Sequence, residues 1–284
     1  MTPTTPSPSP PMDSSMSTVS SMPIDTTGSI DTTTATDTAP ARAIGVLYGV
    51  GVGPGDPELM TMKAVRRIGA SPVVGYFAAK TRPSNARRIA DEVITAAHTE
   101  LRFDYPVTTE HLDALQSYEH MLLACYDEAA ARVEVELLAG RDVAVLCEGD
   151  PLFYGSYMYI HNRLAGRYTA HVIPGISSLT AGSAAIGRPL ACGDELLSVL
   201  SGVMSVDDLK SSLVACDAAV IIKLGRNLIK VKSVIESVGL LDRAFYVERA
   251  TSAAQICSPL AEADVSKAPY FSMVVIPSAV AGVR

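Results

Sequence analysis

The amino-acid sequence predicts an α/β protein, and three observations support this prediction. From Arg42 onward, short apolar runs with the pattern of buried strands alternate with segments that have the pattern of helices. Three of the apolar runs end in loops rich in glycine and proline. The chain has 284 residues, of which 48% are hydrophobic and 19% charged, so it can form a packed core and hold two domains or one large domain.

Residues 1–41 differ in composition from the rest of the chain. They consist mainly of Thr, Ser, Pro, Met, Asp and Ala, and neither Lys nor Arg precedes Arg42. Such a segment buries too little apolar surface to offset the entropy lost on ordering, and it lacks the basic start and apolar centre of a signal peptide. We therefore expect a disordered extension at 1–41, followed by α/β domains at 42–168 and 169–284.

The first glycine-rich loop is YGVGVGPGDPE, at residues 48–58. The apolar residues 44–50 predict a buried parallel strand that leads into it. Asp56 is placed to cap a helix that begins at Pro57, because proline at the first helical position loses no needed N–H group. The helix is expected to end at Ile68, before Gly69, with an apolar stripe that faces a sheet.

Glycines at alternate positions let a backbone come close to a ligand, and a nucleotide is the first candidate. The dinucleotide pattern G-x-G-x-x-G is not met, because Pro54 or Asp56 stands where the third glycine belongs. Residues 61–63 do not supply the Gly-Lys-Ser/Thr of a P-loop, and the Asp56 carboxylate would repel a phosphate. A ligand without phosphate and a tight turn without any ligand both remain open.

Two further loops repeat this arrangement. A strand at 142–147 leads into Glu148-Gly149-Asp150-Pro151, where Asp150 is expected to cap a helix at 151–164. A strand at 170–173 leads into PGISS at 174–178 and an alanine-rich helix that ends before Gly187. Ligands of open α/β sheets bind at the carboxyl ends of the strands, so these loops predict a ligand site.

The remaining segments continue the alternation. Ser84 is expected to cap a helix at 85–97, and Gly140 closes a long, partly amphipathic helix at 109–138. A further helix follows residues 225–227 and runs to about residue 238. The other predicted strands lie at residues 72–77, 101–103, 196–200, 218–224, 245–248 and 270–276.

Charge and residue types argue against several kinds of function. A net charge of -7 and a pI near 5.3 give no footprint for nucleic-acid binding, and no run approaches the length of a membrane span. There is no C-x-x-C pair and no H-x-x-x-H spacing, so no metal site is expected. The cysteines are expected to be small apolar residues in a reducing cytoplasm, although a catalytic Cys–His pair stays open. They are Cys125, Cys147, Cys192, Cys216 and Cys257.

Four motifs, in order, resemble the signatures of the tetrapyrrole methylases. They are VGVGPGDPELMTMKA at 50–64, CEGDPLFY at 147–154, IPGISS at 173–178 and KLGR at 223–226. The resemblance covers essentially all of residues 44–280. Within that family, SNAR at 84–87 and YPVTTE at 105–110 resemble the enzymes that methylate C20 of precorrin-2 in cobalamin (vitamin B12) synthesis.

The resemblance implies two α/β domains of this family's type, with S-adenosylmethionine (SAM) in the cleft between them, usually in a homodimer. The reaction would move the methyl group of SAM to C20 and convert precorrin-2 to precorrin-3A. SAM has hydroxyl, ammonium and sulfonium groups but no phosphate, and acidic loops and backbone carbonyls suit such groups. The residues that would contact SAM are Pro54, Glu148, Gly149, Asp150, Phe153, Ser177, Ser178, Leu224 and Ala250.

The sequence defines the residues that would bind the tetrapyrrole acceptor, called the acceptor side below, less closely than those that would contact SAM. Lys80, Arg82, Arg87 and Arg88 form a local basic excess that would suit the carboxylates of a tetrapyrrole, but a solvated basic helix start explains it equally well. Some relatives have an acidic residue at the end of the second strand, where this chain has Tyr76-Phe77, so no catalytic base is named.

Three alternative functions remain open. They are the same methylation on a cobalt-loaded ring such as cobalt-factor II, another reaction of the family, and a SAM-binding or tetrapyrrole-binding protein without turnover. The segments YFAAK at 76–80 and YPVTTE at 105–110 resemble enzymes that act on the metal-free ring, which we therefore expect as the acceptor.

Overall fold

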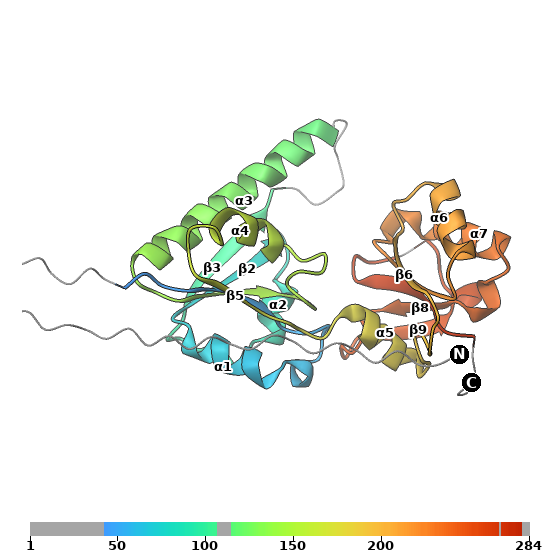
Figure 1. The fold of residues 1–284 in the computed structure, drawn as a ribbon, viewed down its shortest axis with the longest axis horizontal. Coiled ribbons are helices and arrows are strands. Elements are labelled where there is room, and N and C mark those ends of the chain that lie inside the picture. Colours follow the sequence, from blue (N-terminus) through green and yellow to red (C-terminus); the bar gives the residue numbers. More distant parts are fainter. Residues whose placement is uncertain (1–42, 107–114, 267, 280–284) are drawn as a thin grey trace, which may run out of the picture. The chain divides into compact units, whose positions relative to one another are not determined.

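The computed structural model describes residues 43–106, 115–266 and 268–279, and within them the chain forms two five-stranded sheets (Figure 1). The expected extension at 1–41 and the start of the helix expected at 109–138 lie outside the described residues. The α/β fold class predicted from the alternation of strands and helices is confirmed.

The first sheet is entirely parallel and has the strand order β3-β2-β4-β1-β5. Its central strands β1 and β4 are buried along their whole length, as expected for apolar strands that are covered on both faces. The five strands are β1 (Leu47–Gly51), β2 (Val73–Ala79), β3 (Thr99–Tyr105), β4 (Val143–Cys147) and β5 (Ala170–Ile173).

Helices cover both faces of this sheet (Figure 1). On one face lie α1 (Met62–Ala70) and α2 (Asn85–Ile89), whose buried Ile68 and Ile89 pack on the side chains of β1 and β2. On the other face lie α3 (Leu115–Leu138) and α4 (Tyr157–Leu164), which bury Val133 and Ile160 against β3 and β4. The first sheet is therefore the middle of three layers.

The second sheet is mixed and has the order β6-β7-β10-β8-β9. The pair β6 and β7 is parallel, whereas β10 runs antiparallel to β7 and β8, and β9 runs antiparallel to β8. The strands are β6 (Leu197–Ser201), β7 (Ala218–Ile222), β8 (Phe245–Glu248), β9 (Ile256–Pro259) and β10 (Ser272–Ile276).

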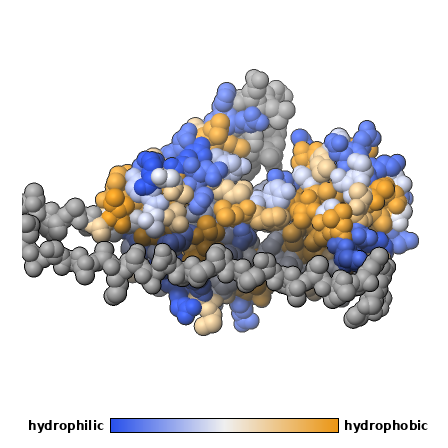
Figure 2. All heavy atoms as spheres, viewed as in Figure 1, coloured by the Kyte–Doolittle hydropathy of each residue, from blue (hydrophilic) through white to orange (hydrophobic). Residues whose placement is uncertain are grey.

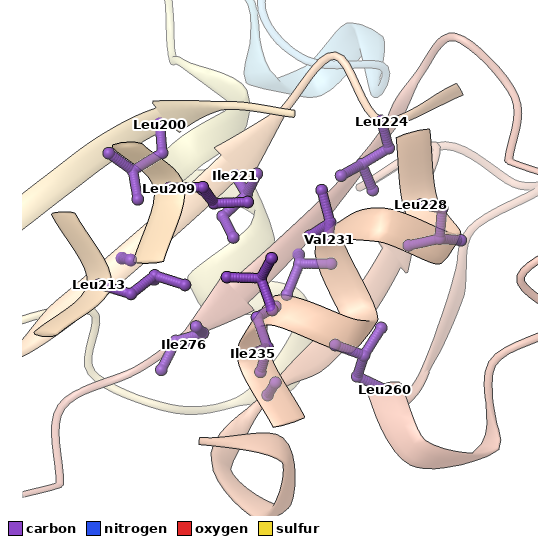
Figure 3. Close-up of a cluster of buried hydrophobic side chains, with 14 of the residues drawn as sticks. Leu200, Leu209, Leu213, Ile221, Leu224, Leu228, Val231, Ile235, Leu260 and Ile276 are labelled. Carbon is purple, nitrogen blue, oxygen red and sulfur yellow. The ribbon is translucent and has the colours of Figure 1, made fainter. Parts of the chain in front are cut away.

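Helices also cover both faces of the second sheet. Figure 3 shows the larger core, in which Leu209 and Leu213 of α6 (Val206–Val214) and Val231 and Ile235 of α7 (Leu228–Ser237) surround Ile221. The opposite face packs on α5 (Ser178–Ile186), where Ala181 contacts the apolar residues of β7, β8 and β10.

The chain passes from one sheet to the other between β5 and α5. β5 pairs with β1 in the first sheet, whereas α5 packs on the second sheet. A boundary between residues 168 and 169 would separate β5 from the sheet that it completes. The chain therefore crosses from the first sheet to the second in residues 174–177, and the domain boundary expected at 168 stays a prediction.

Three helices differ from the sequence prediction. Pro57 begins a 3-10 turn, Pro57–Leu59, and α1 starts later at Met62, where Thr61 caps it by accepting the N–H of Ala64 at 3.1 Å. The helix expected at 151–164 begins only at Tyr157, and the helix expected at 85–97 ends at Ile89. Asp-Pro at a strand end therefore starts a capped turn in both loops, because proline suits the first residue of either kind of helix.

The surface carries both apolar and polar residues. On α3, Leu123, Val135 and Leu138 are exposed although they are apolar, and in the view of Figure 2 hydrophobic and hydrophilic residues alternate across the molecule. This fits the partly amphipathic pattern that the sequence shows for the helix. Among the described residues, no helix has the length and apolar character needed to cross a membrane.

Candidate functional site

The three glycine-rich loops follow β4, β1 and β5, which are neighbours in the first sheet. Because the sheet is parallel, the three loops emerge at the same edge. The N–H of Gly149 donates to the carbonyl of Gly53 at 2.8 Å. A Cβ atom on Gly51 would lie 2.5 Å from the nitrogen of Gly175, and one on Gly175 would lie 2.0 Å from the oxygen of Gly149. The loops named from the sequence therefore touch one another.

These close approaches explain part of the glycine pattern. The sequence suggested that the glycines let the backbone approach a ligand. At Gly51 and Gly175, however, it is the neighbouring loop that approaches, since a side chain at either position would collide with backbone atoms. Gly149 differs, because its φ of 63° is the conformation that glycine tolerates best and the nearest atom to a Cβ there would be 3.8 Å away.

Asp150 connects two of the loops. Its Oδ1 accepts the N–H of Leu152 at 2.9 Å, and its Oδ2 accepts the N–H of Gly175 at 3.2 Å. Asp150 was expected to cap a helix at Pro151, and this is wrong, because the helix starts six residues further on at Tyr157. Its carboxylate instead caps a turn and holds the loop after β5. Asp56 has the simpler role of accepting the N–H of Glu58 at 2.9 Å.

The first loop also contacts the segment after β8. The N–H of Asp56 donates to Thr251 Oγ1 at 3.2 Å, and a Cβ atom on Gly55 would lie 2.9 Å from the carbonyl oxygen of Ala250. Pro54 and Ala250, which lie far apart in the sequence, therefore belong to neighbouring loops. Ala250 is almost fully buried.

Four residues other than glycine have a positive φ in the described part of the chain. They are Tyr154, Lys223, Arg249 and Thr251, with φ between 47° and 67°. All four lie in loops that follow β4, β7 and β8. Such conformations cost of order 1–3 kcal/mol each, and they cluster at functional sites. The amino group of Lys223 lies 4.8 Å from the ring centroid of Tyr154, which joins the β4 loop to the β7 loop.

Glu148 is the carboxyl-bearing residue of the β4 loop that contacts the helix α2. It follows β4 directly, and its Oε1 accepts the N–H of Ala86 in α2 at 3.1 Å. Burial raises the pKa of this carboxyl above its ordinary value, whereas the hydrogen bonds it accepts and the nearby Arg88 act in the opposite direction. The sequence placed Glu148 in a ligand loop but gave no sign of its contact with α2.

The other residues expected to contact SAM differ in the burial and the hydrogen bonds of their side chains. Figure 3 shows the side chain of Leu224 in the core of the second sheet near Leu228, so this side chain is not available to a ligand. Phe153 is 36% exposed and stands edge-on to Tyr154, with 4.9 Å between ring centroids. Ser177 caps α5 by accepting the N–H of Leu179 at 3.3 Å, and Ser178 is the first residue of that helix.

The basic residues expected on the acceptor side do not form one cluster. Arg87 pairs with Glu100 and Asp91, each at 2.7 Å, and these bonds raise the pKa of its guanidinium. Lys80 lines a separate pocket of about 420 Å³ beside β3 and α3. Arg88 is exposed, and its positive charge acts on the carboxyl of Glu148. Arg82 is exposed as well.

Sequence reasoning missed several contacts around these loops. Tyr105 and Ser156 share a hydrogen bond, and burial raises the pKa of the Tyr105 phenol. Glu248 is buried at the end of β8 and accepts from Tyr246 at 3.0 Å and from Arg249. The residues in these contacts come from different elements or belong to no recognisable motif. The linear sequence therefore does not indicate the contacts. Among the described residues, no three His, Cys, Asp or Glu side chains gather as they would around a metal.

The family of the chain follows from comparison with known proteins. Residues 46–264 match the Tetrapyrrole (Corrin/Porphyrin) Methylases. The chain is 46% identical over 234 residues to the precorrin-2 C(20)-methyltransferase of Sinorhizobium sp, a match that covers 82% of this chain and 96% of that relative. The chain belongs to the tetrapyrrole methylase family.

Other relatives add to this picture. The chain is 47% identical over 235 residues to the cobalamin biosynthesis protein CobIJ of Mycobacterium tuberculosis, which covers 83% of this chain. It spans only 46% of that relative, or about half its length. Among solved structures, the fold is similar to that of the methyltransferase CobJ, with a TM-score of 0.61 and 18% identity over 83% of this chain and 95% of the other.

A second solved structure contains a ligand. It is the uroporphyrin-III C-methyl transferase of Thermus thermophilus, complexed with S-adenosyl homocysteine. The TM-score is 0.58 and the identity 23%, over 82% of this chain and 92% of the other. At this level of identity the likeness supports the two-sheet fold.

Proposed function

We propose that the protein is a SAM-dependent methyltransferase that methylates C20 of precorrin-2, giving precorrin-3A, in cobalamin biosynthesis. The observation that carries the proposal is the 46% identity to a precorrin-2 C(20)-methyltransferase over 96% of that enzyme. The contact between the three glycine-rich loops supports it, because these loops contain the motifs that resemble the family's SAM site.

The residues of the site fit SAM. At Gly51, Gly149 and Gly175 the three loops pack backbone against backbone at the strand ends, which is where ligands of open α/β sheets bind. The carboxylate of Asp150 suits the ammonium and hydroxyl groups of SAM, Glu148 and Gly149 offer backbone groups in the same loop, and the exposed ring of Phe153 suits its adenine. When bound, SAM supplies a methyl group on a positively charged sulfur.

In this proposal the protein contributes mainly alignment. The loops after β1, β4 and β5 hold the donor, the backbone at Leu224 and Ala250 limits it on the other side, and Arg88 binds a carboxylate of the ring. Holding two reactants in line can be worth roughly 7 to 11 kcal/mol of a reaction barrier.

The acceptor we propose is the metal-free ring. The chain is 46% identical to the relative that is named for precorrin-2, and 26% identical to the cobalt-precorrin-2 C(20)-methyltransferase of Salmonella typhimurium. A bound cobalt ion would also withdraw electron density from C20 and weaken it as a nucleophile. The cobalt-loaded ring is the second candidate.

Mass spectrometry of the product tests both the reaction and the acceptor. The protein is incubated anaerobically with SAM and equal amounts of precorrin-2 and cobalt-precorrin-2. We expect one added methyl group, predominantly on the metal-free ring. Preferential methylation of the cobalt complex would overturn the acceptor, and binding of both reactants without any methylated product would favour a binding protein.

Arg88 offers a test of the acceptor side. Arg88→Glu should raise the KM for precorrin-2 and leave the affinity for S-adenosylhomocysteine unchanged, because a carboxylate would repel the ring's carboxylates. Arg66→Glu, on the exposed side of α1, is the matched control. Arg87→Glu should instead lower stability, since Arg87 is paired with Glu100 and Asp91. Unaltered kinetics of Arg88→Glu would remove Arg88 from the site.

We also propose that the protein is a homodimer in the cytoplasm, as the resemblance to the family implied. Multi-angle light scattering of the purified protein should give twice the mass of 29.9 kDa calculated for one chain. A mass of one chain at micromolar concentration would contradict the dimer without affecting the proposed reaction.

A further inference from the structure

The edge of the first sheet carries four carboxyl groups in its glycine-rich loops, those of Asp56, Glu58, Glu148 and Asp150. Asp56 accepts the N–H of Glu58, and Asp150 accepts the N–H groups of Leu152 and Gly175. Glu148 accepts from Ala86 and from its own backbone N–H. A carboxylate offers about four acceptor positions, so Glu148 keeps capacity to accept a further hydrogen.

The position of Glu148 places it between the two halves of the proposed site. Its own loop continues into Gly149 and Asp150, which belong to the proposed donor side. Its hydrogen-bond partner Ala86 lies two residues before Arg88, which belongs to the proposed acceptor side. The strand β2, which neighbours β4, ends in Ala78 and Ala79 and offers no side chain that could take up a proton.

We propose that Glu148 is the base that accepts the proton lost from C20 after methyl transfer. This inference rests on the proposed function. As the new carbon–carbon bond forms, the bond from the methyl group to sulfur breaks and S-adenosylhomocysteine leaves. The proton on C20 then moves to the carboxylate of Glu148, and the electron pair of the C20–H bond returns to the ring. The carboxyl later releases the proton to water.

The charged and titratable groups around Glu148 suit this role. The positive charge of Arg88, on α2, favours the carboxylate form of Glu148. Burial raises the pKa of Cys147 to about 12 and also raises that of Tyr105, so both stay neutral near pH 7. A carboxyl whose pKa lies above its ordinary value is also a stronger base.

Glu148→Gln separates the base from a purely structural anchor. Gln keeps the size and the Oε1 acceptor for the Ala86 N–H, but it cannot take up a proton. We expect kcat to fall about 10²- to 10⁴-fold, the usual contribution of a positioned base. The Kd for S-adenosylhomocysteine, measured by calorimetry, should change less than about 2-fold, since the interactions that hold the loops together are retained. The matched control is Glu92→Gln, which alters an exposed carboxyl just after α2 and should turn over normally.

Three further measurements test the proposal without relying on the turnover of Glu148→Gln alone. In the wild type, kcat should fall with decreasing pH as Glu148 becomes protonated, and Glu148→Asp should keep this dependence at a lower rate. The carboxyl resonance of Glu148, assigned in the protein alone by its disappearance in Glu148→Gln, should titrate above the ordinary value of 4.5. Folding disfavours the charged form of Glu148. The free energy of unfolding of Glu148→Gln should therefore be higher than that of the wild type above that pH and equal to it below.

The inference would be overturned by any of three results. Glu148→Gln could turn over at the wild-type rate while Glu148→Ala is impaired, which would leave Glu148 as an anchor of α2. Its kcat/KM could fall only in proportion to weaker S-adenosylhomocysteine binding, which would make Glu148 a donor-binding residue. Its carboxyl could titrate at or below the ordinary value. Failure of the proposed function differs from these, because the wild type would then give no methylated product while the titration still reports on Glu148.

Discussion

The two sheets bring their loops to the proposed site in different ways. In the first sheet the contacts are made by Gly51, Gly149 and Gly175, where the absence of a side chain lets the backbones meet. In the second sheet the corresponding positions hold Lys223, Arg249 and Thr251, which adopt positive φ although they carry side chains. The first sheet therefore gains close approach through glycine, whereas the second sheet, like Tyr154 in the β4 loop, accepts backbone strain at residues that carry side chains.

Replacing a glycine of the first sheet should have the largest effect. In Gly175→Ala the new Cβ would lie 2.0 Å from the oxygen of Gly149 and 2.9 Å from Gly51, so the loops must separate. We expect a loss of about 3 kcal/mol or more in the free energy of unfolding, at the upper end for overpacked sites. Urea unfolding measures this. In Gly166→Ala nothing lies within 4 Å of the Cβ, and a similar loss there would contradict the steric explanation.

Removing the carboxylate that joins two first-sheet loops should have the next largest effect. Asp150→Asn leaves one oxygen to accept from either Leu152 or Gly175, so one N–H loses its partner. Hydrogen bonds to charged groups contribute about 1.5–3 kcal/mol, and we expect a loss in this range together with weaker S-adenosylhomocysteine binding. Asp56→Asn, which concerns a single bond within one turn, should cost less. Equal losses in the two variants would show that Asp150 does not connect the loops.

The strained loops of the second sheet can be tested with a matched pair of variants. Lys223→Gly and Lys223→Ala both remove the amino group that lies over Tyr154, but only glycine relieves the positive φ of 57°. The free energy of unfolding of Lys223→Gly should therefore be about 1 kcal/mol higher than that of Lys223→Ala. Thermal unfolding of the two proteins side by side gives the difference. If the alanine variant were as stable, the backbone there would carry no strain.

The smallest effect concerns the ion pair that holds α2 to β3. The hydrogen bond from Arg87 lowers the pKa of the Glu100 carboxyl, and that from Tyr76 adds to it. Folding therefore favours the charged form, and the stability from this pair is present above about the ordinary value of 4.5 and is lost as pH falls through the lowered value. Glu100→Gln should be slightly less stable than the wild type at neutral pH, and the difference should vanish in acid. A constant difference across this range would exclude the ion pair as its cause.

The contrast between the sheets also explains what could be predicted from the sequence. Glycine and proline are visible in a linear sequence, so the loops after β1, β4 and β5 and their strands were predicted correctly. Strain at Lys223 or Arg249 has no such mark, and these loops were assigned only through resemblance to the family. The partners of Glu148 and Asp150 could not be predicted either, because they depend on the strand order β2-β4-β1-β5.

The errors in the predicted helix starts have a common physical cause. The signals for helix starts at Asp56-Pro57 and Asp150-Pro151 satisfy a short capped turn as well as a helix, so the predicted starts were early by several residues. The helix α6 and the strand β9 were missed. For α6 a signal existed, since Ser205 accepts the N–H of Asp208 at 3.1 Å and so caps the helix. β9 is a sheet edge with largely exposed residues, which lacks the apolar pattern of a buried strand.

The strand order of the first sheet has a consequence for how the protein is made. β1 pairs only with β4 and β5, and residue 46 meets its partner Asp142 at a sequence separation of 96 residues. At about 5–20 residues per second, a ribosome takes roughly 5 to 20 seconds to make that stretch. During this interval the apolar segment Leu47–Gly51 has been synthesised but has no strand to pair with, which leaves the nascent chain open to aggregation or to binding by a chaperone.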